Sequence, residues 1–208
     1  MNANPTAAIV IIGDEILSGR TQDTNTRAIA CFLAPLGIDL KEVRVVGDVE
    51  DEIVAALNAL RFRYSYVFTT GGIGPTHDDI TADAVAKAFG VGIDYHPEAM
   101  ALIEARFDKN PADLNRARKR MARVPLGADL IKNRVSAAPG FQVGNVFVMA
   151  GVPSIMQAML EDVAPRLARG QPLVVATVSA PLAEGAVAGP LAQLQKACPS
   201  VSIGSYPF

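Results

Sequence analysis

Three segments of the chain place glycines and acidic residues directly after a hydrophobic run. They read IGDEILSGRTQDTN at 12–25, VVGDVEDE at 45–52 and TTGGIGPTHDDITADAV at 69–85. Glycine lets backbone N–H groups come close to anionic oxygen atoms, and carboxylates that meet on one rim repel each other unless they hold a cation. The three segments therefore predict a site for a phosphate-bearing small molecule, together with Mg²⁺ or a similar divalent metal.

The third segment carries two adjacent aspartates beside a glycine-rich loop, and it allows two interpretations. The glycines of the loop are Gly71, Gly72 and Gly74. If a helix begins at Thr76, Asp79 completes a capping box and, with Asp78, serves only the first helical turn. If Thr81 is the helix cap instead, residues 71–80 form a loop that can wrap a ligand, and Asp79 stands beside it as a metal ligand or polarising group. The loop is neither a Walker motif, which needs GKS or GKT, nor a GxGxxG fingerprint.

Further candidate ligand-binding residues follow other hydrophobic runs of the chain. They are Gly13, Asp14, Glu15, Ser18, Gly151 and Ser154. Asp48 follows the second run and is either an acid of the site or only the N-cap of the next helix. The turn at 151–154 either receives an anion at a helix N-terminus, with Ser154 well placed to cap that helix, or is a plain turn.

The elements that must position these residues alternate between strands and helices. Short apolar runs predict strands at 7–13, 39–47, 64–72, 128–135 and 144–151, and helical periodicity predicts helices at 24–37, 48–63, 80–90, 97–109, 112–123 and 154–170. This alternation implies parallel strands with right-handed crossovers, so residues 1–170 are predicted to form a three-layer α/β/α sandwich with a mostly parallel sheet. In such a sheet the three acidic segments share one rim.

Residues 171–208 repeat the pattern on a small scale. A strand at 172–180, a helix at 183–198 and a strand at 200–208 are predicted from their sequences. Together they predict the start of a small α/β module that is cut short, since 38 residues are few for an independent domain.

Bulk composition excludes several classes of protein. The 208 residues carry 19 basic and 21 acidic side chains, a net charge of −2, which gives no general attraction to nucleic acid. The sequence shows no apolar run long enough for a membrane span and no signal-peptide pattern, and its two cysteines lie far apart, so a cytoplasmic protein is predicted. The basic residues at 116–123 spread around their predicted helix, which favours a solvated face.

With these motifs in place, the sequence resembles the molybdopterin-binding domain family, and within it the CinA-like (competence/damage-inducible) branch. The similar segments include GDEILSGRTQDTN, TTGGIGPTHDDITADAVAKAFG, APGF and AGVPSIM, which run from about residue 6 to residue 165. The resemblance implies a domain that binds molybdopterin or a nucleotide diphosphate and assembles as a dimer or trimer. Relatives are credited either with adenylylating molybdopterin or with cleaving the pyrophosphate of ADP-ribose, using a divalent metal.

The resemblance also assigns roles to residues of this chain. It makes Asp79 and Asp48 the catalytic and metal-binding acids, with the three glycines as the ligand loop. Asp78 stands where the adenylylating branch tends to carry a basic residue, which favours a metal-dependent ADP-ribose pyrophosphatase. Molybdopterin adenylylation, or a pterin- or nucleotide-binding module without turnover, is the alternative. Ala150 and Ser136 replace a proline and a glycine that are common in the family, so the identity of the ligand stays open at that turn.

Overall fold

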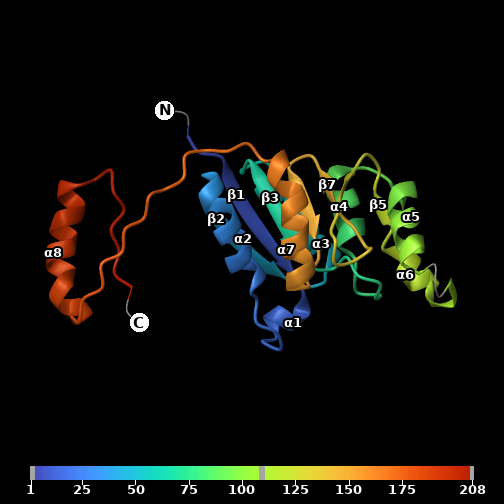
Figure 1. Ribbon diagram of the computed structural model, residues 1–208, viewed down its shortest axis with the longest axis horizontal. Helices are drawn as coiled ribbons and strands as arrows, with labels where there is room; N and C mark the ends of the chain where they lie inside the picture. The colour runs from blue at the N-terminus through green and yellow to red at the C-terminus, as the bar shows by residue number, and fades with distance from the viewer. Residues whose placement is uncertain (1–2, 108–110, 207–208) are drawn as a thin grey trace. The chain divides into compact units, whose positions relative to one another are not determined.

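The computed structural model of the chain describes residues 3–107 and 111–206 (Figure 1). The chain divides into two compact units, residues 1–173 and residues 174–208. The first unit contains all the residues of the predicted site. Over the described ranges, no helix has the length and apolarity needed to cross a membrane.

The first unit is built on a six-stranded sheet in the order β2-β1-β3-β8-β7-β6. Its strands are β1 (Thr6–Ile12), β2 (Asp39–Val46), β3 (Tyr66–Thr70), β6 (Asp129–Ile131), β7 (Gly140–Val143) and β8 (Val146–Met149). β2, β1, β3 and β8 run parallel, whereas β7 pairs antiparallel with both β8 and β6. The predicted α/β fold with a mostly parallel sheet is therefore confirmed.

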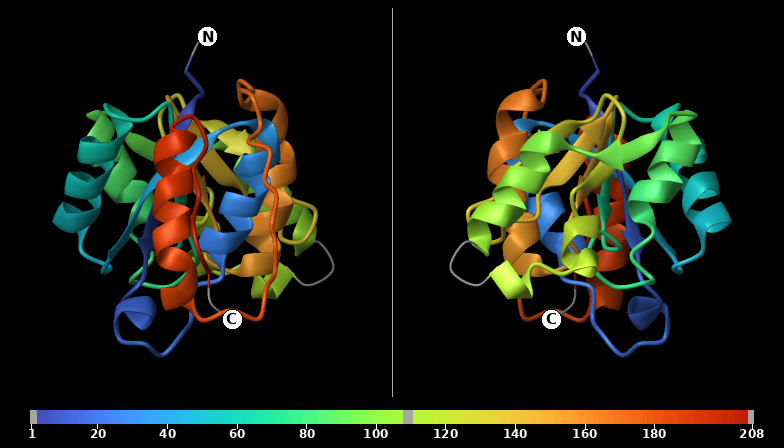
Figure 2. Two further views of the ribbon diagram at one scale, coloured as in Figure 1. Left: turned by 90° about the vertical axis from the view of Figure 1, so that its left-hand side faces the viewer. Right: turned by 90° about the vertical axis from the view of Figure 1, so that its right-hand side faces the viewer.

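Helices cover both faces of this sheet (Figure 2). On one face lie α3 (Glu50–Arg61) and α4 (Thr81–Phe89), and on the other lie α2 (Asn25–Leu33) and α7 (Pro153–Val163). Single 3-10 turns follow α2 and α7, at η1 (Ala34–Leu36) and η3 (Ala164–Arg166). Along β1, successive side chains from Ala7 to Ile12 alternate between the two cores. A strand that is buried on both sides must be apolar at every position, which explains the uninterrupted hydrophobic run.

The region after α4 differs from its predicted elements. Its elements are β4 (Ile93–Tyr95), α5 (Pro97–Arg106), η2 (Pro111–Asp113), α6 (Arg116–Arg120) and β5 (Arg123–Pro125). The predicted helix at 97–109 is α5, with positions 108 and 109 outside the described residues, and the predicted helix at 112–123 is shortened to α6. Asn115 starts α6 by accepting the N–H of Arg118, and the chain then turns so that β5 pairs antiparallel with β4.

The predicted strand at 128–135 is shorter than expected, and β7 follows it as a strand that the sequence did not predict. Asn133 Oδ1 accepts the backbone N–H groups of Val135 and Ser136, which turns the chain away from the sheet after Ile131. The chain returns as β7, whose pairing with β8 closes a hairpin. β7 is stabilised by this partner and not by a strong local pattern, because only four residues form it.

In the second unit, the predicted helix at 183–198 is confirmed as α8 (Glu184–Ala197). The predicted strands at 172–180 and 200–206 are wrong, because neither segment pairs with a strand in the part of the chain that the structure describes; positions 207 and 208 lie outside it. Val174 and Val178 are 98% and 91% exposed. Local strand propensity does not make a strand without a partner for the backbone hydrogen bonds.

Candidate functional site

Strands β1, β2, β3 and β8 end at one rim of the sheet, and the loops that follow them carry the predicted site. α1 (Asp14–Leu17), which follows β1, and the loop 71–80, which follows β3, lie at the same end of the unit (Figure 1). β2 lies on one side of β1 and β3 on the other, so the strand order reverses between β1 and β3. Ligands of open parallel sheets bind at such a switch point, at the carboxyl ends of the strands.

Asp14 and Asp48, from the ends of β1 and β2, are joined by reciprocal hydrogen bonds. The Asp14 N–H donates to Asp48 Oδ2 at 3.0 Å, and the Asp48 N–H donates to Asp14 Oδ1 at 3.3 Å. α3 begins at Glu50 with Val49 as its N-cap, so the interpretation of Asp48 as a helix cap is wrong. The acids of two predicted segments are therefore in direct contact.

The pKa of the Asp48 carboxyl is raised above its usual value. Partial burial is the main cause, and the negative charges of Asp14, Glu15 and Asp78 add to it, against the opposing hydrogen bond from the Asp14 N–H. The Glu15 carboxylate folds over Gly13, where a Cβ would come within 2.4 Å of it. Carboxylates from all three predicted segments thus share one region of the rim, which favours a cation or the N–H and O–H donors of a ligand.

The predicted divalent-metal site involves Asp48 and Asp79. The described residues contain no group of three or more histidine, cysteine, aspartate or glutamate side chains that could hold a metal ion. Asp48 is bonded to Asp14, whereas the Asp79 carboxylate is bonded to Thr76. Mg²⁺ commonly takes one or two carboxylates and completes its shell with water and ligand phosphates. The metal-binding role of Asp48 and Asp79 therefore stays a prediction.

The glycine-rich segment forms a loop, because α4 begins at Thr81 and not at Thr76. The prediction that Thr81 is the helix cap is wrong, because the N-cap is Ile80. Residues 71–80 contain bends, turns and irregular backbone, with no helix or strand. Among them, Asp79 Oδ2 accepts the N–H of Thr76 at 2.7 Å and also accepts its hydroxyl. The hydrogen bond expected of a capping box thus exists, but it closes a turn inside the loop instead of starting the helix.

Gly71 and Gly72 are required by the packing of this loop. Their φ angles are 105° and 66°, in the region that favours glycine. A Cβ on Gly71 would lie 2.1 Å from the carbonyl oxygen of Ile12, and one on Gly72 would lie 2.1 Å from Thr81 Oγ1. Thr81 donates its N–H to the Gly72 carbonyl and its hydroxyl to the Gly71 carbonyl. The loop is thereby held against the end of β1 and the first turn of α4.

The turn after β8 contacts the start of the glycine-rich loop. Gly151 packs on Gly71, whose Cα would lie 3.2 Å from a Cβ at position 151, and the Gly151 carbonyl accepts the Asn25 side-chain N–H at 2.8 Å. Asn25 is 6% exposed, and its Oδ1 has no hydrogen-bond partner among the described protein atoms. The predicted capping role of Ser154 is wrong, because Val152 is the N-cap of α7 and Ser154 lies exposed on its first turn. Segments that follow β1, β3 and β8 thus meet at the Gly71–Gly151 contact.

The remaining predicted residues lie on the exposed parts of these loops. Ser18 is the C-cap of α1, and its hydroxyl donates to the Glu15 carbonyl and accepts from Arg20. Gly74 makes room for the Asp79 carboxylate, which lies 2.7 Å from the place of a Cβ there. The Asp78 side chain is 58% exposed.

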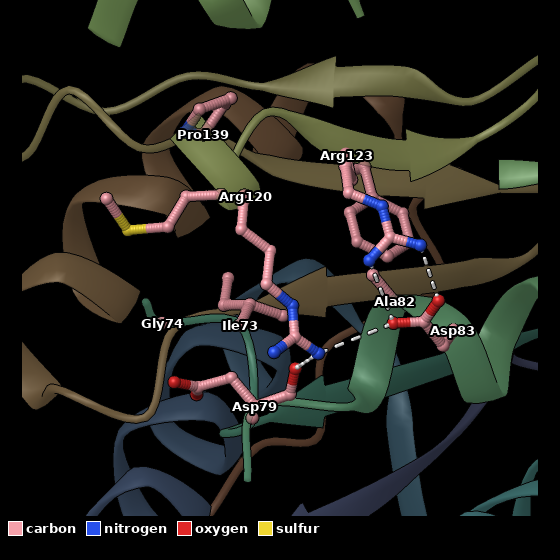
Figure 3. A pocket seen from close by; sticks show the side chains of 11 residues that line it. Ile73, Gly74, Asp79, Ala82, Asp83, Arg120, Arg123 and Pro139 are labelled. Carbon is pink, nitrogen blue, oxygen red and sulfur yellow. Dashed lines mark hydrogen bonds and ion pairs between the residues drawn. The ribbon is translucent and has the colours of Figure 1, made fainter. Parts of the chain in front are cut away.

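Sequence reasoning missed the basic side of the loop. A small pocket lies between the loop and α6, with Gly74, Asp79 and Arg120 among the residues that line it (Figure 3). The Arg120 guanidinium donates to the carbonyl oxygens of Thr76 and Asp79 at 3.3 and 3.1 Å. The expectation of a solvated basic face is therefore wrong for Arg120. The sequence did not distinguish Arg120 from the several basic residues that surround it, so its contact with the loop could not be predicted.

A doubly wound α/β unit with acids, glycine turns and helix N-termini at its switch point is typical of domains that bind small anionic molecules. Residues 8–169 match the family described as "Probable molybdopterin binding domain", and the chain belongs to this family. Residues 172–208 match a second family, described as "FAD synthase, middle domain". The predicted resemblance to the molybdopterin-binding domain family is confirmed.

Solved structures resemble the first unit. The protein CinA from Thermoplasma acidophilum, described as of unknown function, is 34% identical with a TM-score of 0.73, over 79% of this chain and 99% of that chain. The protein MoaB from Pyrococcus furiosus, described as tungsten cofactor synthesizing, is 19% identical with a TM-score of 0.52, over 80% of this chain and 94% of that chain. At this lower identity the second match shows a shared fold only, whereas the first confirms the CinA-like resemblance.

Two further relatives are longer than this chain. A protein from Aeropyrum pernix is 35% identical over 219 residues, which cover 100% of this chain and 81% of the relative. A protein from Caldivirga maquilingensis is 36% identical over 165 residues, which cover 77% of this chain and 64% of the relative. The match therefore spans a little less than two thirds of the Caldivirga protein.

Proposed function

We propose that the first unit binds a molybdopterin-type ligand, a pterin that carries a phosphate group, at the rim between β1 and β3. The observation that supports this most directly is that the segments after β1, β3 and β8 meet at the Gly71–Gly151 contact. This contact lies on the same rim as Asp14 and Asp48, which are joined by hydrogen bonds. Membership of the molybdopterin-binding domain family supports the class of ligand.

The rim offers two kinds of recognition. α4 and α7 begin there, at Thr81 and Pro153, and the N-terminal turns of helices stabilise a phosphate. The carboxylates of Asp14, Asp48 and Asp78 accept hydrogen bonds, and one edge of a pterin ring presents an amino group and a ring N–H. Phosphate alone is repelled by these acids. The arrangement therefore favours a ligand with a phosphate at one end and hydrogen-bond donors at the other.

Anaerobic equilibrium binding of molybdopterin, quantified as its fluorescent oxidised pterin, tests this proposal. Asp48→Asn is the test variant, because an asparagine Oδ1 still accepts the Asp14 N–H while the negative charge is removed. With EDTA present, we expect about tenfold weaker molybdopterin binding from the loss of a charge-assisted hydrogen bond, and no weaker binding of inorganic pyrophosphate. Glu104→Gln, which neutralises an exposed acid of α5, is the matched control and should bind like the wild type.

Two outcomes contradict the proposal. Wild-type protein that does not bind molybdopterin rules out this ligand class. Equal affinity of the wild type and of Asp48→Asn for molybdopterin would show that the Asp48 carboxylate does not contact the ligand.

A second candidate is metal-dependent cleavage of a nucleoside diphosphate such as ADP-ribose. Water would attack the adenylyl phosphorus, and the bridging P–O bond would break to release AMP and ribose 5-phosphate. The meeting of Asp14 and Asp48 at the rim favours it, because Mg²⁺ commonly takes one or two carboxylates and completes its shell with ligand phosphates. Asp79→Asn should abolish AMP release, measured by chromatography with and without Mg²⁺, while the far-UV circular dichroism stays unchanged. Normal release would leave Asp79 only its role in closing the Thr76 turn.

Assembly as a dimer or trimer stays a prediction that light scattering would test.

A further inference from the structure

Arg120 is held between an acid of the core helix α4 and the ligand loop (Figure 3). Its guanidinium lies 3.7 Å from Asp83 Oδ2, and Arg123 donates to the same carboxylate at 2.8 and 3.5 Å. The side chains of Arg120, Asp83 and Arg123 are only 29%, 29% and 26% exposed. Because Asp83 lies in the first turn of α4 and Arg123 lies in β5, the network is anchored on two packed elements.

The other end of the network is the backbone of the loop. Arg120 donates to the Thr76 and Asp79 carbonyls, which are three residues apart. Figure 3 shows the Asp79 carbonyl oxygen turned toward Arg120 and the Asp79 carboxylate turned away from it. That carboxylate closes the turn from the other side, through the N–H and the hydroxyl of Thr76. Two sets of contacts thus hold the turn 76–79.

These contacts also orient the donors of the loop. In a planar trans peptide, the C=O and the following N–H point in opposite directions. With the Thr76 and Asp79 carbonyls held by Arg120, the N–H groups of His77 and Ile80 point away from the arginine. Arg120 therefore sets the direction of loop N–H groups and the position of the Asp79 carboxylate.

We propose that Arg120 is a positioning residue: anchored by Asp83 and Arg123, it holds the turn 76–79 in the conformation that binds the ligand. The role in binding rests on the proposed function, whereas the effect on the loop does not. The two can therefore fail separately.

Hydrogen-exchange mass spectrometry of the full chain reads the loop without any ligand. Arg120→Ala should raise the exchange rates of the Thr76 and Asp79 amides by about tenfold or more, because both hydrogen bonds from the guanidinium to the loop carbonyls are lost. Arg120→Lys should raise them less, because lysine keeps the charge but lacks the fork that reaches two carbonyls. Arg118→Ala is the matched control, since Arg118 lies on the same helix but bonds to the Asp113 carbonyl and stacks on Phe107.

Unchanged loop exchange in Arg120→Ala would overturn the proposal. So would an equal rise throughout the first unit, because that marks a general loss of stability. If the alanine variant fails to fold, Arg120→Lys provides the same comparison of the loop with the rest of the unit.

Molybdopterin binding separates the two inferences. Where the wild type binds, Arg120→Ala should bind about tenfold more weakly, because the loop must first be ordered. Equal binding would overturn the positioning role. Where the wild type does not bind, selective loop opening in Arg120→Ala still supports the effect of Arg120 on the loop, and only the ligand proposal fails.

Discussion

Replacing Gly72 by alanine tests the loop geometry against a matched position in the same unit. Gly72 and Gly90 have nearly the same φ angle, 66° and 67°. A Cβ at Gly72 would lie 2.1 Å from Thr81 Oγ1, whereas no atom of the described residues comes within 4 Å of a Cβ at Gly90. Gly72→Ala and Gly90→Ala therefore share the backbone strain and the stiffer unfolded chain, and differ in the steric clash.

The size of the difference follows from what the new methyl group displaces. A left-handed backbone costs an alanine about 1 kcal/mol at either position. At position 72 the methyl must also displace Thr81, which is fully buried and donates its hydroxyl to the Gly71 carbonyl at 3.0 Å. Overpacking costs about 1–3 kcal/mol, and the lost hydrogen bond costs about 1 kcal/mol. We expect the free energy of unfolding to fall by about 1 kcal/mol in Gly90→Ala and by about 3–5 kcal/mol in Gly72→Ala.

Urea denaturation followed by far-UV circular dichroism measures both losses, since the chain has no tryptophan to serve as a fluorescent probe. A double variant that adds Thr81→Ala to Gly72→Ala should lose less than the sum of the two single variants, because the clash with the hydroxyl is gone. Equal losses in Gly72→Ala and Gly90→Ala would refute the reasoning, since they would mean that Thr81 does not crowd Gly72.

The acid pair and the core provide the remaining predictions. Because the pKa of Asp48 is raised on folding, the native state binds the Asp48 proton more tightly than the unfolded chain. The contribution of Asp48 to stability is therefore greatest below its unfolded pKa and is lost as pH rises through its folded pKa. Asp48→Asn should remove this loss and give a urea midpoint above that of the wild type at neutral pH; a lower midpoint would contradict the sign. Phe68→Ala should cost about 3–5 kcal/mol, because a fully buried ring is removed. Phe62→Ala, at a residue that is 78% exposed, should cost less than about 1 kcal/mol, and similar losses in the two phenylalanine variants would contradict the packing.

Local pattern and chain order were enough to predict much of the fold. The apolar run from Ala7 to Ile12 predicts a strand buried on both faces, and β1 is such a strand at the centre of the parallel pairs. The contact of Asp14 with Asp48 was also predictable in outline, because parallel neighbours end at the same rim and each acid follows one of them directly. Local pattern left open where α4 begins, since the capping-box hydrogen bond forms in either case.

Only the tertiary structure decided which segments find partners. Residues 172–180 have the β-branched composition of a strand and form none in the described chain, whereas the short β7 becomes a strand because β8 and β6 lie on either side of it. Arg118 and Arg120 occupy the same short helix and look alike in the sequence. Arg118 stacks on Phe107. Arg120 instead donates to the carbonyls of Thr76 and Asp79, which lie 44 and 41 residues earlier in the chain. The sequence by itself determined the parallel strands β1, β2, β3 and β8 and the acidic rim at their ends, because hydrophobic pattern and chain order can be read along the chain. The strand β7 and the contact of Arg120 with the ligand loop depend on how distant segments pack.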